Sequence, residues 1–192
     1  MKKKVWIGLL ALAVVIAAAA LLTGLLGGGR TLPEGAAALY KDTAISEETV
    51  AYLESAYAQA GQTVNREKII DQLLMNCVVE EAAAQGGFAA GEDEVAALLD
   101  VQRQTYEEFP EAREVVDGYC EEQGITLEDY WVLAEEHARH TILRAKYQEW
   151  FYAAQLPEQE IDPEKNPQQA YEAYEEHCQQ LLCAASSHIT HR

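Results

Sequence analysis

The fold of this 192-residue chain depends on the stretch Val64–Val95, VNREKIIDQLLMNCVVEEAAAQGGFAAGEDEV. Asn65 can accept a hydrogen bond from the free amides of a first helical turn. One apolar stripe then recurs at helical spacing and comprises Ile69, Ile70, Leu73, Leu74, Cys77, Val78 and Ala82. Gly86–Gly87 ends the pattern, because glycine adopts the left-handed backbone conformation without a Cβ penalty. We therefore expect a central helix from Asn65 to about Gln85, with the neighbouring helices packed around it.

The rest of the body shows the same helical periodicity. Further helices are expected over Ser46–Ala60, Glu92–Phe109, Glu111–Gln123, Thr126–Gln155 and Gln168–Ala185. Ser46 can cap the first of these helices, and Thr126 with Asp129 forms a variant of the capping box. Gly61 and Gly124 follow predicted helix ends. No alternating apolar run with a two-residue hairpin turn is recognised, so the predicted fold class is all-α.

The N-terminus carries a targeting signal. Lys2, Lys3 and Lys4 precede Val5–Leu26, a run of 22 uncharged residues that would span about 33 Å as a helix. The lysines are expected to stay in the cytoplasm, which places the C-terminal body outside the cell membrane. Residues 1–30 are thus predicted to be cytoplasmic lysines plus a single-pass membrane anchor. The alternative is a signal peptide cleaved near Ala18–Ala20, which would release a secreted body.

Three further segments are distinguished by composition. Residues 31–45 include Pro33 and show no periodicity, so we expect a flexible tether. Residues 46–185 are expected to form the helical domain, because about half of the chain is apolar and a folded core is possible. Residues 186–192 are predicted to be a flexible tail.

The net charge of −18 excludes one class of partner. Residues 1–30 hold four basic and no acidic residues, which leaves −22 on the remainder. Such a body repels phosphate backbones, so no nucleic-acid binding is expected. The acid pairs Glu80–Glu81 and Glu107–Glu108 are interpreted as solvated helix faces.

Several segments resemble a known family. They are Ile69–Leu74, Glu81–Ala82, Gly86–Gly87, Glu92–Val95, Ala44–Glu48, which would open the first helix, and Gly124–Tyr130, which would open the long helix. These segments resemble the N-terminal chaperone domain of SurA, PrsA and related extracytoplasmic folding factors. The resemblance extends over roughly Ala44–Gln155 and concerns the residues that begin and end helices.

This resemblance implies a SurA N-terminal-like helical domain that holds unfolded or secreted polypeptides near the membrane, without a cofactor. In that family a C-terminal helix returns to the core, and the helix Gln168–Ala185 is placed to do this. Residues 157–192 are predicted to be a linker, a helix and a tail, which leaves no room for the family's parvulin prolyl isomerase domain. We therefore expect no isomerase activity. The alternative function is a membrane-tethered helical scaffold that binds one specific protein partner.

Aromatic residues cluster at both ends of the long helix and at the start of the last one. The candidate client-binding residues are Tyr130, Trp131, Trp150, Phe151, Tyr171 and Tyr174. Aromatic rings on helical walls offer large apolar area that can hold unfolded segments of varied sequence. The other interpretation is that these rings fill the core between the two helices.

No catalytic or metal site is expected. No nucleotide-binding or nucleophile motif occurs in the sequence. His137 and His140 have a spacing that could share a metal ion, but the preferred interpretation is a solvated face carrying two histidines. The four cysteines are Cys77, Cys120, Cys178 and Cys183. They allow three full pairings, and we expect mostly unpaired thiols, with Cys77 buried on the apolar stripe.

Overall fold

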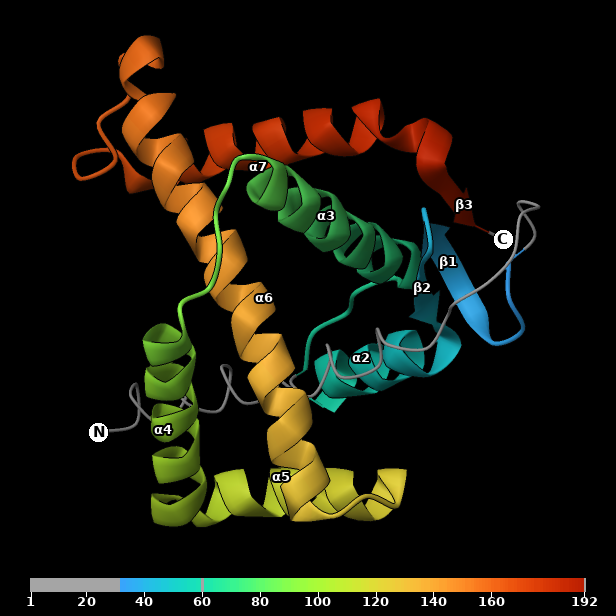
Figure 1. Cartoon of the computed structure of the whole chain (residues 1–192). Helices are drawn as coiled ribbons and strands as arrows, with labels where there is room; N and C mark the ends of the chain where they lie inside the picture. The colour runs from blue at the N-terminus through green and yellow to red at the C-terminus, as the bar shows by residue number, and fades with distance from the viewer. Residues whose placement is uncertain (1–31, 60, 192) are drawn as a thin grey trace. The chain divides into compact units, whose positions relative to one another are not determined.

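The computed structural model describes residues 32–59 and 61–191. The helices in this range are α2 (Glu47–Gln59), α3 (Arg66–Gln85), α4 (Glu92–Glu108), α5 (Pro110–Gln123), α6 (Leu127–Ala154) and α7 (Pro167–Ala184), with single 3-10 turns η1 (Pro157–Gln159) and η2 (Ser186–His188). The strands are β1 (Ala36–Tyr40), β2 (Thr43–Ser46) and β3 (Ile189–His191) (Figure 1). The predicted membrane anchor lies outside the described residues. Within them, no helix has the length and apolar character needed to cross a membrane.

The predicted helices are confirmed, and their ends differ from the expected ones by one residue at most. The cap residues act as their side chains suggest. Asn65 Oδ1 accepts from the backbone amide of Lys68 at 2.8 Å, which begins α3. Thr126 N donates to the Asp129 carboxylate at 3.0 Å, and Asp129 N donates to Thr126 Oγ1 at 3.1 Å, which closes the capping box at the start of α6. These local hydrogen bonds explain why the sequence located the helix ends well.

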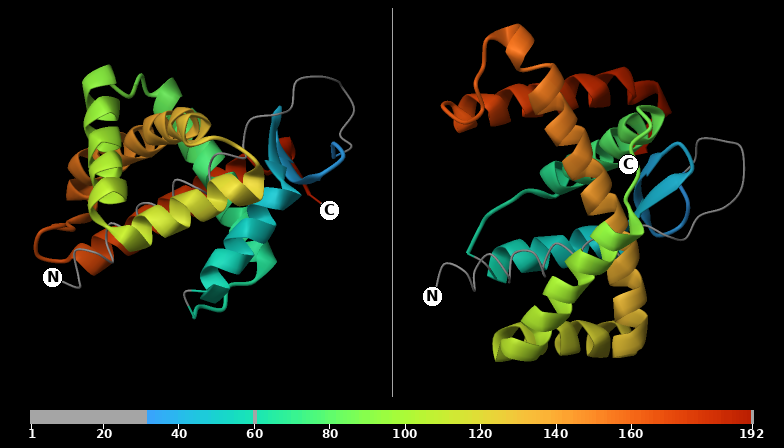
Figure 2. Two further views of the ribbon diagram at one scale, coloured as in Figure 1. Left: turned by 90° about the horizontal axis from the view of Figure 1, so that it is seen from below. Right: turned by 60° about the vertical axis from the view of Figure 1, so that its left-hand side comes forward.

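The fold is mainly helical, as predicted, but the expectation that the body contains no strand is wrong. The three strands form one antiparallel sheet in the order β2-β1-β3. β1 and β2 form a hairpin that lies in the predicted tether except for Ser46, and β3 lies in the predicted tail (Figures 1 and 2). Leu39 pairs with Ala44 on one side and with Thr190 on the other, so the two ends of the body meet in one sheet.

The sequence does not predict the sheet, for two physical reasons. Ala36, Ala37 and Ala38 occupy most of β1, and alanine has a low strand propensity. The hairpin turn is Lys41–Asp42, with Lys41 at φ +52°, whereas the turn sought in the sequence is one rich in glycine and asparagine. Pairing with β3 is non-local and leaves no periodic signal at all.

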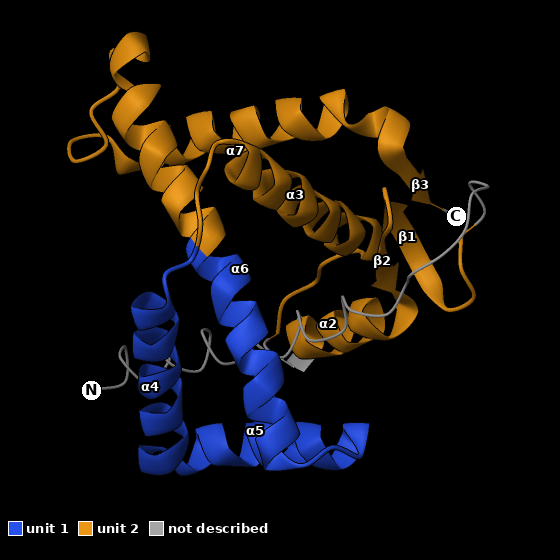
Figure 3. Cartoon of the chain, in the orientation of Figure 1, with its two compact units in different colours: residues 1–20, 90–142 blue, residues 21–89, 143–192 orange. Residues whose placement is uncertain are grey.

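The Cα positions divide the chain into two compact units (Figure 3). The α4–α5 unit consists of Ala90–Ile142 and includes α4, α5 and the first part of α6. The sheet unit comprises residues 32–89 and 143–191 of the described chain, with the sheet, α2, α3, the last part of α6 and α7.

Helix α3 lies in the middle of the sheet unit. Residues Ile69, Leu73, Leu74, Cys77 and Val78 pack with β1, β2 and α2 in one buried cluster that also contains Ile45 and Val50. Val79 and Ala83 pack in a second cluster with Tyr147 of α6 and Cys178 of α7. α3 is therefore covered on more than one side, and α7 returns to it as expected.

Two adjacent glutamates of α3 make ion pairs with different elements. Glu80 pairs with Arg144 of α6, and its side chain is only 13% exposed. Glu81 pairs with Lys41 and accepts a 2.7 Å hydrogen bond from the Tyr40 hydroxyl of β1. The interpretation of Glu80–Glu81 as a solvated face is therefore wrong, whereas Glu107 and Glu108 are exposed as expected.

We predict that β3 contributes measurably to stability. Ending the chain at Ala185 removes the β1–β3 pairing and the hydrogen bond from Lys41 N to His188 O. The free energy of unfolding, measured by urea denaturation, should fall by about 2 kcal/mol because several ladder hydrogen bonds and part of the Ile189 burial are lost. An unchanged midpoint and slope would show that the last residues carry no structure.

Candidate functional site

The six predicted binding residues do not form one site. Tyr130 and Trp131 belong to the α4–α5 unit. The other four residues belong to the sheet unit and are Trp150, Phe151, Tyr171 and Tyr174.

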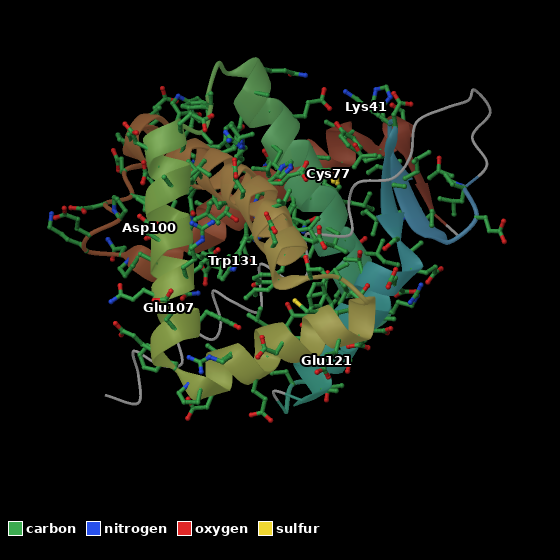
Figure 4. The ribbon with its side chains drawn as sticks, turned by 60° about the horizontal axis from the view of Figure 1, so that its bottom comes forward. Lys41, Cys77, Asp100, Glu107, Glu121 and Trp131 are labelled. Atoms are coloured by element: carbon green, nitrogen blue, oxygen red, sulfur yellow. The ribbon has the colours of Figure 1, made fainter. Side chains whose placement is uncertain are left out.

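In the α4–α5 unit, Tyr130 is a core residue. It is 1% exposed, and its ring meets that of Tyr119 edge to face at 6.1 Å. Trp131 is half-buried between α4 and α6, as Figure 4 shows, with Tyr106 at 5.9 Å and the Arg103 guanidinium 5.4 Å from its ring centre. The core interpretation is correct for Tyr130, and Trp131 connects two helices.

In the sheet unit, Phe151 fills the core. It is 2% exposed and contacts His177 in a stacked geometry at 4.8 Å and Tyr174 edge to face at 5.5 Å. The Tyr147 hydroxyl and His177 Nε2 are hydrogen-bonded at 2.9 Å. Burial lowers the pKa of the His177 imidazole below its ordinary value. Rings from α6 and α7 thus hold the two helices together.

Two of the six residues remain exposed. Trp150 lies beside the rings of Tyr147 and Phe88 at 5.2 and 6.2 Å and is still 37% exposed. Tyr171 is 47% exposed and donates a hydrogen bond to Glu175 at 2.8 Å. These two side chains are accessible to another polypeptide, whereas Phe151 and Tyr130 are not.

The aromatic pattern missed a set of exposed aliphatic residues. Large aliphatic side chains of the α4–α5 unit that are exposed are Val101, Val115, Leu127 and Val132. Val101 and Val132 are the most exposed, at 60% and 65%. Val101 lies off the buried stripe of α4, which runs through Val95, Leu99 and Gln102. In the sequence, an apolar residue outside the buried stripe of its helix was the signal that could have identified this exposed apolar surface.

The charges of the chain are unevenly distributed. Ala90–Ile142 carries fifteen acidic residues and three arginines, a net −12 over 53 residues. Residues 32–89 and 143–191 carry seventeen acidic and six basic residues, a net −11 over 107 residues. The α4–α5 unit therefore has about twice the negative charge per residue.

The histidine and cysteine candidates lie in separate environments. His137 is buried and hydrogen-bonds Thr141 at 3.2 Å, so its assignment to a solvated face is wrong. No cluster of three or more side chains that could hold a metal ion occurs in the described part of the chain. All four cysteines are free thiols, as expected: Cys77, Cys120 and Cys178 are buried, and Cys183 is exposed. Burial raises the pKa of the Cys77 thiol to about 12, which keeps it protonated and unreactive.

We predict a pH-dependent stability term from His177. The variant His177→Phe keeps a ring against Phe151 and Tyr147 but removes the titrating imidazole. The pKa of His177 is lower in the folded chain than in the unfolded chain, so the unfolded chain binds the proton more tightly. Packing of the neutral imidazole therefore stabilises the fold above about pH 6.5, and this stabilisation is lost as the pH falls below that value. Urea denaturation at several pH values should show the variant gaining relative to the wild type in acid. Parallel curves would contradict this, and Gln179→Phe, at an exposed position of α7, is the control.

Comparison of the chain with protein-family models, with curated proteins and with solved structures finds no match. The similarity to the SurA and PrsA domains therefore stays a prediction from the motifs quoted above.

Proposed function

We propose that this chain is a membrane-anchored, extracytoplasmic chaperone-like protein that holds unfolded or secreted polypeptides and has no isomerase activity. Holding needs no covalent chemistry. It needs accessible apolar surface that buries a client's exposed side chains reversibly, and enough charge to keep the complex in solution.

One observation carries the proposal. Six large apolar side chains are exposed on the helices of the described chain: Val101, Val115, Leu127, Val132, Trp150 and Tyr171. They come from α4, α5, α6 and α7. Burying an exposed valine or tryptophan under a client segment stabilises the complex by about 1–3 kcal/mol for each side chain. The net charge of −18 keeps such a surface from self-association.

The N-terminal sequence supports the proposed location. A lysine-headed apolar segment would hold the body at the outer side of the membrane, where secreted chains emerge unfolded. The same body released after signal-peptide cleavage would act in solution. In both cases the described units are the part that meets the client.

The exposed aliphatic residues also favour a second function, a tethered scaffold for one defined partner. Valine is stiff at χ1, so Val101 and Val132 present a fixed shape. Surfaces that bind many partners typically use flexible methionine instead, and Met75 is the methionine within the described residues, where it packs against the core. A fixed apolar surface suits one complementary partner.

An aggregation assay separates these functions. We expect the full chain in detergent to suppress aggregation of several unrelated proteins during thermal unfolding. The double variant Val101→Ser and Val132→Ser should require about ten-fold more protein for half suppression, because apolar contact worth about 1.4 kcal/mol is lost. Its melting temperature should stay unchanged because both side chains are exposed.

The matched control is Ala96→Ser and Ala97→Ser, at exposed positions of α4 that offer little apolar area. This control should suppress aggregation like the wild type. A wild-type chain that is inert towards every client, yet binds one partner in fixed stoichiometry, would overturn the chaperone function and establish the scaffold.

A further inference from the structure

We propose that the α4–α5 unit, Ala90–Ile142, is the client-docking surface and that it selects cationic amphipathic segments. These are segments in which lysine or arginine is interspersed with aliphatic residues. The inference rests on the proposed function and specifies the class of polypeptide that is held.

The first support is the excess of carboxylates over basic groups. Three arginines face fifteen acidic residues in this unit, and each arginine is already engaged. Arg139 pairs with Glu92 and Glu135, both at 2.7 Å. The other two arginines lie over aromatic rings, Arg103 over Trp131 and Arg113 over Tyr106. The acidic residues of the unit therefore outnumber its arginines by twelve.

The second support is how the acids are placed among the exposed aliphatic residues. On α5, Glu111 lies four residues before Val115 and therefore shares its helix face. Val132 shares a helix face with residues 128, 135 and 136, which are all glutamates, because positions three and four apart on a helix are neighbours. Exposed aliphatic side chains and carboxylates thus share a helix face at Val115 and at Val132, which complements a segment that carries both aliphatic and cationic side chains.

The third support is accessibility. Asp100 and Glu107 lie along α4 and Glu121 lies on α5, and all three are exposed (Figure 4). Val101 and Val132 are 60% and 65% exposed, so an incoming segment can reach aliphatic side chains of this unit as well as its carboxylates.

Other occupants fit this surface less well. If a second copy of the chain docked through the same surface, two units of net charge −12 each would face one another, and such like-charge contact is unfavourable. Nucleic acids and anionic lipid surfaces are repelled for the same reason. A cationic polypeptide gains from both the charge and the aliphatic side chains, and charge steering also speeds its encounter with the surface.

The test uses the full chain in a non-ionic detergent and a fluorescein-labelled peptide of alternating lysine and valine. Fluorescence anisotropy measures its Kd, with a peptide that has glutamate for each lysine as the comparison. Tight binding of the lysine peptide that weakens with added salt, and no binding of the glutamate peptide, is expected. Equal binding of both peptides would overturn the inference.

A charge-matched pair of variants locates the surface. Asp100→Asn, Glu107→Gln and Glu121→Gln together should weaken binding of the lysine peptide about five-fold, because three exposed charge contacts are lost. The control removes three exposed carboxylates of the sheet unit by Glu149→Gln, Glu158→Gln and Glu164→Gln and should change the Kd less than about two-fold. Equal weakening by both triples would overturn the inference, because overall charge would then suffice.

Two more outcomes keep this inference separate from the proposed function. If carbodiimide links Lys2–Lys4 to the α4–α5 unit and no added peptide binds, the chain's own N-terminal segment is the occupant and the inference is overturned. If the wild type suppresses aggregation but its peptide binding shows no charge preference, the inference fails and the holding function stands. If the wild type suppresses the aggregation of none of the clients, the proposed holding function is itself wrong.

Discussion

Burial of α3 on more than one side is the constraint on which the sheet unit depends. Leu74 and Val78 face β1, β2 and α2, whereas Val79 and Ala83 face α6 and α7. Neighbouring elements from both ends of the body are needed to cover these side chains. The strand β3 then pairs with β1, so the two ends are also hydrogen-bonded to each other. The unit therefore depends on contacts that are distant in sequence.

The helices of this chain could be predicted because their signals are local. Asn65, Thr126 with Asp129, and the positive-φ glycines Gly87 and Gly124 act on residues within one turn. The sheet could not be predicted in this way, since β1 is built largely of alanine and finds one of its partners at the far end of the chain. Its ladder is a property of the folded unit rather than of either segment.

The candidate site was predictable only in part, for a related reason. Aromatic rings mark large apolar area, but Tyr130 and Phe151 use that area inside the protein. Periodicity places a residue on a face and does not say whether another element covers that face. The burial of Glu80 and His137 could not be predicted for the same reason, and Glu80 pairs with Arg144, which is distant in sequence. Val101 and Val132 are exposed because no described element covers their side of the helix.

The most direct test of this dependence on α3 is native-state hydrogen exchange of the full chain. The slowest amides of α3, β1 and α7 should exchange with the same free energy of opening, because each loses its cover when another leaves. Fast exchange throughout α7 and β3, with α3 and β1 still protected, would contradict it. That result would mean that α3 keeps its fold without the C-terminal elements.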